Sequence, residues 1–319
     1  MTHVRRRLHA GQLSGAWVTR VNGNARTTRT RASSKPCAGF PESYERLVRD
    51  VQLTLRRFVD DRSGHARVME VEFPVSGLDS VAGDGEGCAE MSASSGYLSA
   101  VLSELMRRGN DKPTKTRVLF PDKNELLFQK RRRDSANSQG EASGGLADGN
   151  VFNLAAEQFR TGFLTDPSPW LEIGWDKNKR PIKELVGAAD DDDLYVAAYP
   201  HFNINETLAL RELDEEVCEP TNKLLLIFNG ELDRFRGNYY PSLFYPKAAS
   251  LSEEWLPRVE TLYYIHNFRG VKFGSLFRCF PGDWEVLRRK EGEPGTATLI
   301  ASFETRPSLA DVAEIIRQS

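Results

Sequence analysis

Short apolar segments alternate along this chain with segments of helical periodicity, and this alternation limits the possible folds more than any other feature. Three strand candidates, 117–120, 194–199 and 224–228, consist mainly of aliphatic and aromatic residues. Helical patterns begin after the first two of them, near Glu125 and Glu206. Parallel neighbouring strands need a crossover connection, which a helix supplies. The sequence therefore predicts an α/β fold with an open, largely parallel sheet flanked by helices.

The segments before and after this central region extend the same pattern. Apolar residues three and four positions apart predict an amphipathic helix over 43–60. In 69–73, Met, Val and Phe alternate with Glu70 and Glu72, which predicts a half-buried strand. A helix is expected over 97–108, where Gly109 ends it.

The last third of the chain predicts a different arrangement. A helix is expected near 252–266, followed by β-like stretches at 272–280, 284–289 and 298–303. These stretches lie close together in the sequence, so we expect them to pair antiparallel. Ser308 and Asp311 have the spacing of a helix cap. The fold class therefore includes a C-terminal antiparallel β extension and a final helix.

The first acidic residue in the chain is Glu42. The first 40 residues contain eight basic residues and many Ser and Thr hydroxyls. This composition is typical of an organellar transit peptide. The alternative is a basic tail that binds nucleic acid or an anionic membrane, but the charges are scattered rather than clustered with aromatic residues. We expect residues 1–40 to be a removed transit peptide, with the mature terminus between positions 32 and 42.

Without that leader, residues 41–319 carry 35 basic and 45 acidic residues, a net charge of about −10. Phosphate backbones repel such a body, so nucleic acid is not expected as a partner. No apolar run approaches the roughly 20 residues of a membrane-spanning helix, so any membrane association is expected to be peripheral. We expect one α/β domain over 41–319, with a disordered Ser- and Gly-rich insertion at 134–149.

Sites for metals, cofactors or catalysis are not expected from the motifs. Cys37 is expected to leave with the leader, and Cys88, Cys218 and Cys279 are far apart, which favours single thiols over a disulfide or zinc site. The glycine-rich loop 83–87 lacks phosphate-binding spacing and contains two acidic residues, so a structural turn is favoured. The acidic run 190–193 is interpreted as a solvated turn rather than a cation site.

The two histidines His201 and His266 are also expected to be structural, because no nucleophile motif accompanies them. No catalytic residues are therefore predicted.

The segment 229–245 has the most unusual composition in the chain. It follows the apolar strand 224–228, at the end of the sheet where open α/β folds place their sites. Its aromatic and Arg residues suit a protein interface, but the same rings could equally pack over the sheet. The candidate partner-binding residues are Asn229, Glu231, Asp233, Arg234, Tyr239, Tyr240 and Tyr245.

Several strings of this sequence resemble one known family. They are LDSVAGDGEG at 78–87, AYPHFNINE at 198–206, IFNGELDR at 227–234, YYIHNF at 263–268 and FRCFPG at 277–282. They are similar to a domain of unknown function shared by plastids and cyanobacteria, which includes the plastid factor called low photosystem II accumulation three and is also found attached to a plastid adenylate kinase. The resemblance covers the chain from about Pro41 onward, except around 130–164.

The resemblance implies a non-enzymatic chloroplast factor in the stroma or at the stromal face of the thylakoid. Its partners would be photosystem II assembly proteins or subunits, at the stage when an inner-antenna chlorophyll protein is inserted. The alternative is a plastid enzyme or nucleotide-binding module. It would use the strand-end residues Asp122, His201 and Glu231, together with Asp233.

Overall fold

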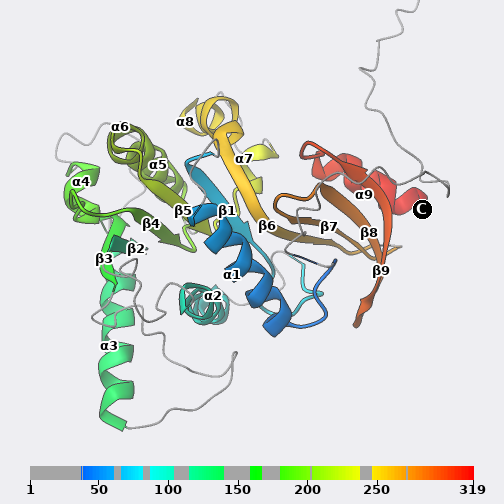
Figure 1. The fold of residues 1–319 in the computed structure, drawn as a ribbon, viewed down its shortest axis with the longest axis horizontal. Coiled ribbons are helices and arrows are strands. Elements are labelled where there is room, and N and C mark those ends of the chain that lie inside the picture. Colours follow the sequence, from blue (N-terminus) through cyan, green and yellow to red (C-terminus); the bar gives the residue numbers. More distant parts are fainter. Residues whose placement is uncertain are drawn as a thin grey trace, which may run out of the picture. The chain divides into compact units, whose positions relative to one another are not determined.

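A mixed sheet of nine strands organises the part of the chain that the structure describes (Figure 1). The structure is a computed structural model, and it describes residue 37 and residues 39–60, 66–81, 87–103, 115–139, 159–166, 180–201, 203–237, 246–270 and 272–319. Residues from Ser33 to Ser319 group into one unit. The first 36 residues, and with them most of the expected leader 1–40, lie outside the described residues, whereas Cys37, Gly39 and Phe40 are described.

The strand order is β3-β2-β4-β5-β1-β6-β7-β8-β9. All neighbours from β3 to β6 pair parallel, and all neighbours from β6 to β9 pair antiparallel. The strands are β1 (Val68–Glu72), β2 (Thr116–Asp122), β3 (Arg160–Thr165), β4 (Leu194–Ala198), β5 (Leu224–Phe228), β6 (Val259–Phe268), β7 (Gly274–Cys279), β8 (Trp284–Lys290) and β9 (Glu293–Phe303). The predicted α/β class, with its antiparallel extension and final helix, is confirmed.

Helices cover both faces of the parallel part, and the last helix packs on the antiparallel extension. The helices are α1 (Tyr44–Asp60), α2 (Gly87–Leu102), α3 (Lys123–Gln139), α4 (Ile182–Val186), α5 (Ile204–Leu213), α6 (Glu219–Thr221), α7 (Asp233–Arg236), α8 (Pro246–Ser250) and α9 (Leu309–Gln318). A π-helical turn (Asp214–Cys218) follows α5, and another (Leu251–Trp255) follows α8 and leads into a 3₁₀ turn (Leu256–Arg258). The Ser308 hydroxyl caps α9 by accepting from the Asp311 N–H at 3.1 Å, as the sequence predicts.

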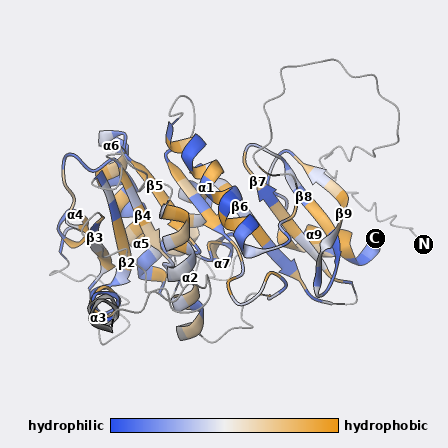
Figure 2. Ribbon diagram, turned by 60° about the horizontal axis from the view of Figure 1, so that its bottom comes forward, coloured by the Kyte–Doolittle hydropathy of each residue, from blue (hydrophilic) through white to orange (hydrophobic). Residues whose placement is uncertain are grey.

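Two hydrophobic cores lie on opposite faces of the parallel strands. Met69 and Val71 of β1 pack with α1 and α2 in one core, whereas Val68 packs with α4, α5 and α8 in the other. Figure 2 shows hydrophobic residues concentrated along the central strands between these layers. Because both faces are covered, β1, β2, β4 and β5 are buried along nearly their whole length rather than on alternate residues.

The predicted helix at 252–266 is wrong for most of its length. Val259–Phe268 is strand β6, which pairs parallel with β1 and antiparallel with β7. Its sequence, VETLYYIHNF, combines β-branched and aromatic residues, and its long apolar content also fits a helical period. Because neighbouring strands pair with this segment on both sides, it forms a strand and not a helix.

Other local expectations also change. Helix α2 begins at Gly87, ten positions before the predicted start. Helix α3 continues through residues 134–139, into the interval expected to be disordered, and residues 140–149 lie outside the described part. Within the acidic run, Asp192 is not solvated: it is 1% exposed and pairs with Arg117 and Arg160, each at 2.8 Å. These arginines stabilise a carboxylate that burial alone would disfavour.

The cysteine expectation is also corrected. Cys37 forms a disulfide with Cys279 of β7, 242 positions later in the chain, and their Cα atoms are 6.2 Å apart. Cys218 is a buried free thiol, as expected. Sequence spacing cannot reveal a pairing between cysteines that only the sheet topology brings together.

Candidate functional site at the ends of β1, β5 and β6

The carboxyl ends of β1 and β5 lie side by side where the chain leaves the sheet in opposite directions. After β1 the chain continues to α2 on one face, and after β5 it continues to α7 on the other face. Such a switch point is where open α/β sheets place their ligand sites. The predicted partner-binding segment begins here, at Asn229.

Asn229 joins β5 to its neighbours from inside the molecule. It is 5% exposed, its N–H donates to the Val71 carbonyl at 2.8 Å, and its side-chain oxygen accepts from the Phe73 N–H at 3.1 Å. Its side-chain amide also donates to Ser94 of α2 at 3.3 Å. Asn229 has a positive φ of 50°, and this left-handed conformation is one that Asn tolerates better than most residues.

Glu231 and Arg234 form the outer part of the site. Glu231 also has a positive φ, 48°, which is uncommon for this residue type and indicates backbone strain held by its surroundings. Its side chain is 38% exposed and lies 3.5 Å from the Arg234 guanidinium, which is 29% exposed. Arg234 in turn donates to the His201 carbonyl. These two charged side chains are therefore held at the surface of the rim.

A buried carboxylate, Glu70 of β1, lies beneath this rim. It shares the second face of the sheet with Val68, because side chains alternate along a strand, and it is 3% exposed. Arg236 of α7 and Arg306 each donate to it at 2.7 Å. The hydroxyl of Thr261 in β6 adds a bond of 2.8 Å. The expectation of a half-buried strand with solvated glutamates is wrong at Glu70.

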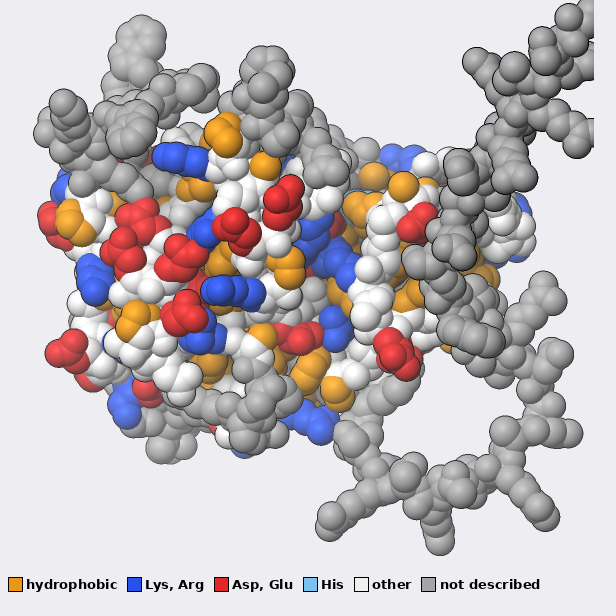
Figure 3. All heavy atoms as spheres, turned by 90° about the horizontal axis from the view of Figure 1, so that it is seen from above, with side chains coloured by type: hydrophobic (Ala, Val, Ile, Leu, Met, Phe, Trp, Pro, Cys, Tyr) orange, Lys and Arg blue, Asp and Glu red, His pale blue; other side chains and the backbone are white. Residues whose placement is uncertain are grey.

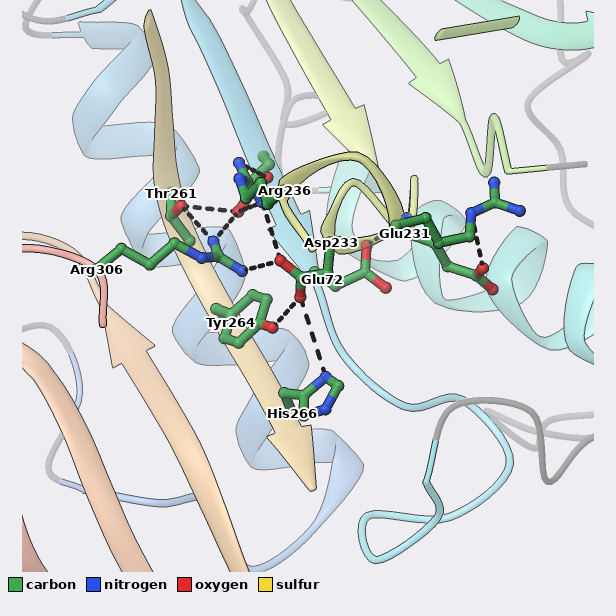
Figure 4. Close-up of polar contacts among 10 residues, drawn as sticks. Glu72, Glu231, Asp233, Arg236, Thr261, Tyr264, His266 and Arg306 are labelled. Atoms are coloured by element: carbon green, nitrogen blue, oxygen red, sulfur yellow. Dashed lines mark hydrogen bonds and ion pairs between the residues drawn. The ribbon is translucent and has the colours of Figure 1, made fainter. Parts of the chain in front are cut away.

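Arg306, from the loop between β9 and α9, connects Glu70 to Asp233 of α7. Its guanidinium lies 2.5 Å from the Asp233 carboxylate, which also accepts from the Tyr264 hydroxyl. We call the group Glu70, Glu72, Glu231, Asp233, Arg236, Thr261, Tyr264, His266 and Arg306 the acid–arginine cluster (Figure 4). Its members come from β1, β6, the segment after β5, and the C-terminal extension.

Aromatic rings enclose the Arg306 guanidinium. Its central carbon lies 4.4 Å from the Tyr264 ring centre and 4.6 Å from that of Trp284 in β8. Arg278 of β7 lies 5.0 Å from the same Trp284 ring. Guanidinium groups are stabilised over aromatic faces, more so when water is excluded. The stacking therefore fixes the orientation of Arg306 toward Glu70 and Asp233.

The cluster drives the pKa values of two carboxyl groups in opposite directions. Burial raises the pKa of Glu72 well above its usual range, and the nearby carboxylates of Glu231, Glu70 and Asp233 act in the same direction; only the Glu231 N–H, at 3.0 Å, opposes them. Burial also disfavours ionised Asp233, but Arg306 and Arg236 outweigh it and lower its pKa. The pKa of Glu72 is therefore raised and that of Asp233 lowered because the two carboxyl groups have different surroundings.

His266 of β6 lies next to these acids. Its Nδ1 is 4.0 Å from the Asp233 carboxylate, and its ring stacks beside Tyr264. Burial lowers the pKa of His266, although Asp233 opposes this effect. A neutral imidazole, an ionised carboxylate and a carboxyl of raised pKa are groups that can exchange protons near neutral pH.

The alternative rim residues are only partly brought together. His201 and Glu231 are linked through Arg234, and His201 Nδ1 lies 3.2 Å from the Asn229 carbonyl. Asp122, at the end of β2, instead accepts from the Glu125 N–H at 2.8 Å and so caps helix α3.

A separate hollow lies on another part of the surface. Its volume is about 610 Å³, and residues 42–45 and 76–80, Arg269 and Glu291 line it. Asp122, His201 and Glu231 do not line it.

Charged side chains are also interspersed on the face that carries α5 and α8, with acidic ones most frequent in its left half (Figure 3).

Part of the predicted site lies outside the described residues. This applies to Tyr239, Tyr240 and Tyr245 and to positions 83–86 of the glycine-rich loop. Within the described residues, no three His, Cys, Asp or Glu side chains are grouped so that they could hold a metal ion. In the same part of the chain, no helix has both the length and the hydropathy needed to cross a bilayer.

Sequence reasoning missed Glu70, Arg236, Thr261, Tyr264 and Arg306 as site residues. One signal was available: a strand between parallel neighbours is covered on both faces, so a Glu within it needs a buried cationic partner. Nothing in the local pattern around Arg306 identifies it as that partner.

Comparison with known proteins places the whole folded region in one family. No curated protein and no solved structure matches the chain significantly. A family model described as "Domain of unknown function (DUF1995)" matches residues 41–314, which include all the described strands and the acid–arginine cluster. The chain therefore belongs to the DUF1995 family.

Proposed function

We propose that this protein is a non-enzymatic chloroplast factor that assists photosystem II assembly through protein–protein contacts. The proposal rests on the resemblance of the quoted sequence strings to plastid assembly factors, and all of these strings lie within the matched residues 41–314. The finer resemblance to low photosystem II accumulation three points to insertion of an inner-antenna chlorophyll protein. The protein would act in the stroma or peripherally at the stromal face of the thylakoid.

The observation that carries the proposal is how charge is distributed at the rim. Glu70 and Asp233 are already neutralised by Arg236 and Arg306 inside the cluster. Glu231 and Arg234, in contrast, remain partly exposed, and the Glu231 N–H is bonded to the Glu72 carboxylate of the cluster at 3.0 Å. Charged side chains on a fixed backbone favour orientation and choice of a protein partner.

Charge reversal at the rim tests this role. Glu231→Lys keeps a long side chain and removes a negative charge near Glu72, but it also replaces the ion pair with Arg234 by repulsion, so we expect a loss of folding stability of about 1 kcal/mol at most. The matched control is Glu293→Lys, which changes an exposed Glu at the start of β9. Both proteins are expressed as tagged full-length chains and purified from plastids. The photosystem II assembly intermediates that co-purify are quantified, and the melting temperature of each variant is measured.

We expect Glu231→Lys to recover roughly 30-fold less of the intermediates, the effect of losing about 2 kcal/mol at an interface. The control should recover them normally. If Glu231→Lys recovers as much of the intermediates as Glu293→Lys, the rim is excluded as the partner surface.

A second candidate function has its own supporting observation. The opposite pKa shifts of Glu72 and Asp233, beside His266, lie at a topological switch point, and perturbed groups gather at catalytic sites. This arrangement favours a plastid enzyme or nucleotide-binding module that uses the strand ends.

Thermal shift with millimolar ATP, NAD(P) or divalent metal separates the two candidates. A ligand at 100 times its dissociation constant stabilises a protein by about 2.7 kcal/mol. The assembly-factor proposal predicts no saturable shift with these ligands. A shift that disappears in Glu72→Gln would favour the enzyme instead.

A further inference from the structure

The disulfide between Cys37 and Cys279 lies where the chain enters the folded unit. It joins the segment before α1 to the end of β7, and the two cysteines are 6% and 8% exposed. The Thr54 hydroxyl of α1 lies 3.6 Å from the Cys279 sulfur. We call residue 37 and residues 39–43 the strap, because the disulfide holds one end of this segment and α1 holds the other.

The strap covers polar and apolar groups of the antiparallel extension. The Phe40 ring lies 5.6 Å from the Phe277 ring of β7 and 3.8 Å from the guanidinium carbon of Arg289 in β8. Arg289 is 5% exposed and donates to Asp79, Asn267 and Ser275. Its Nε has no hydrogen-bond partner among the described residues. The strap therefore shields a buried cation from water.

The strap also forms one wall of the 610 Å³ hollow. Glu42 and Ser43 line that hollow together with Asp79, the residue that binds Arg289. A change in the strap therefore reaches both the Arg289 contacts and the shape of the hollow.

We propose that the Cys37–Cys279 disulfide is a redox modification site that a dithiol reductant opens, releasing the strap and uncovering the Phe277–Arg289 surface. The backbone hydrogen bonds of β7 go to β6 and β8, not to the strap. Opening the strap thus breaks side-chain contacts but leaves the sheet intact.

The exchange is balanced with one dithiol. Its thiolate attacks one sulfur of the disulfide and forms a mixed disulfide, and the second thiol of the reductant displaces the protein sulfur. Two electrons and two protons pass to the protein. The products are Cys37 and Cys279 as thiols and the reductant as a cyclic disulfide.

The test uses the full chain, oxidised or treated with dithiothreitol, and compares hydroxyl-radical labelling of aromatic side chains by mass spectrometry. Maleimide labelling of denatured samples counts the thiols in each state. Cys37→Ser mimics the reduced state without a reductant, and Cys218→Ser is the control because that buried thiol is not in a disulfide.

We expect dithiothreitol to reduce the disulfide without denaturant and to increase labelling of Phe40 and Phe277, whose rings pack together under the closed strap. Cys37→Ser should match the reduced protein, whereas Phe228 of β5, which is fully buried, should stay unlabelled in every sample. The proposal is overturned if the oxidised chain shows both thiols, if dithiothreitol acts only with urea present, or if reduction leaves the labelling of Phe40 and Phe277 unchanged.

Discussion

Replacing Arg306 with Met tests whether the acid–arginine cluster holds the ends of β1, β5 and β6 together. The change removes ion pairs to Glu70 at 2.7 Å and to Asp233 at 2.5 Å. Glu70 is 3% exposed, so water cannot replace the lost partner. Removing one partner from a buried ion pair costs about 3–5 kcal/mol of folding stability.

The magnitude is expected near the lower end of that range. Arg236 still binds Glu70 at 2.7 Å, while the stacking of Arg306 on Tyr264 and Trp284 adds about 1 kcal/mol to the loss. Met fills much of the vacated volume. We therefore expect Arg306→Met to lower the free energy of unfolding by about 3–4 kcal/mol, a large part of the 5–15 kcal/mol that is typical of folded proteins.

Arg278→Met is the matched control. Arg278 also stacks on Trp284, but its ion pair is with Glu260, which is 28% exposed. Losing this ion pair and the stacking should together cost about 1–2 kcal/mol. Urea unfolding followed by tryptophan fluorescence measures both variants. If the two variants lose the same stability, the buried cluster does not stabilise the fold as argued.

Three other predictions follow from the same structure. Because the pKa of Glu72 is raised in the folded state, Glu72 contributes to folding stability fully below about pH 4, and this contribution is lost as pH rises through the folded pKa. Glu72→Gln should remove this decline in stability when urea unfolding is measured across pH. An unchanged pH profile would exclude Glu72 as the source of the decline. Asp122→Ala should cost about 1 kcal/mol by uncapping α3, whereas Asp122→Asn should lose much less in the same assay. Because Cys37 is disulfide-bonded, we expect plastid processing between positions 32 and 37; N-terminal sequencing of plastid protein decides this, and an intact Met1 would contradict it.

The sequence is sufficient to predict the parallel half of the sheet. The predicted strand over 224–228 coincides with β5, because a short apolar run between turn residues fits a strand buried on both faces. The amphipathic pattern of α1 is equally direct: Leu47, Val51 and Leu55 recur at helical spacing and are all buried. These elements depend on local patterns, which one sequence contains.

Elements that depend on distant partners could not be predicted. Val259–Phe268 becomes a strand because β7 pairs with it on one side and β1, which lies far earlier in the sequence, pairs with it on the other. The burial of Glu70 depends on Arg306, 236 positions later in the chain. For the same reason, the charged residues predicted at this strand end are Glu231, Asp233 and Arg234, and the buried partners Glu70 and Arg306 were not predicted.

Pulse labelling of photosystem II in plastids depleted of this protein tests the central claim most directly. Newly made subunits are followed through assembly complexes separated on native gels, with and without the wild-type chain restored. We expect depleted plastids to accumulate a complex that lacks an inner-antenna chlorophyll protein, and restoration to relieve the block. Photosystem II assembly at the normal rate without the protein would contradict the proposed function.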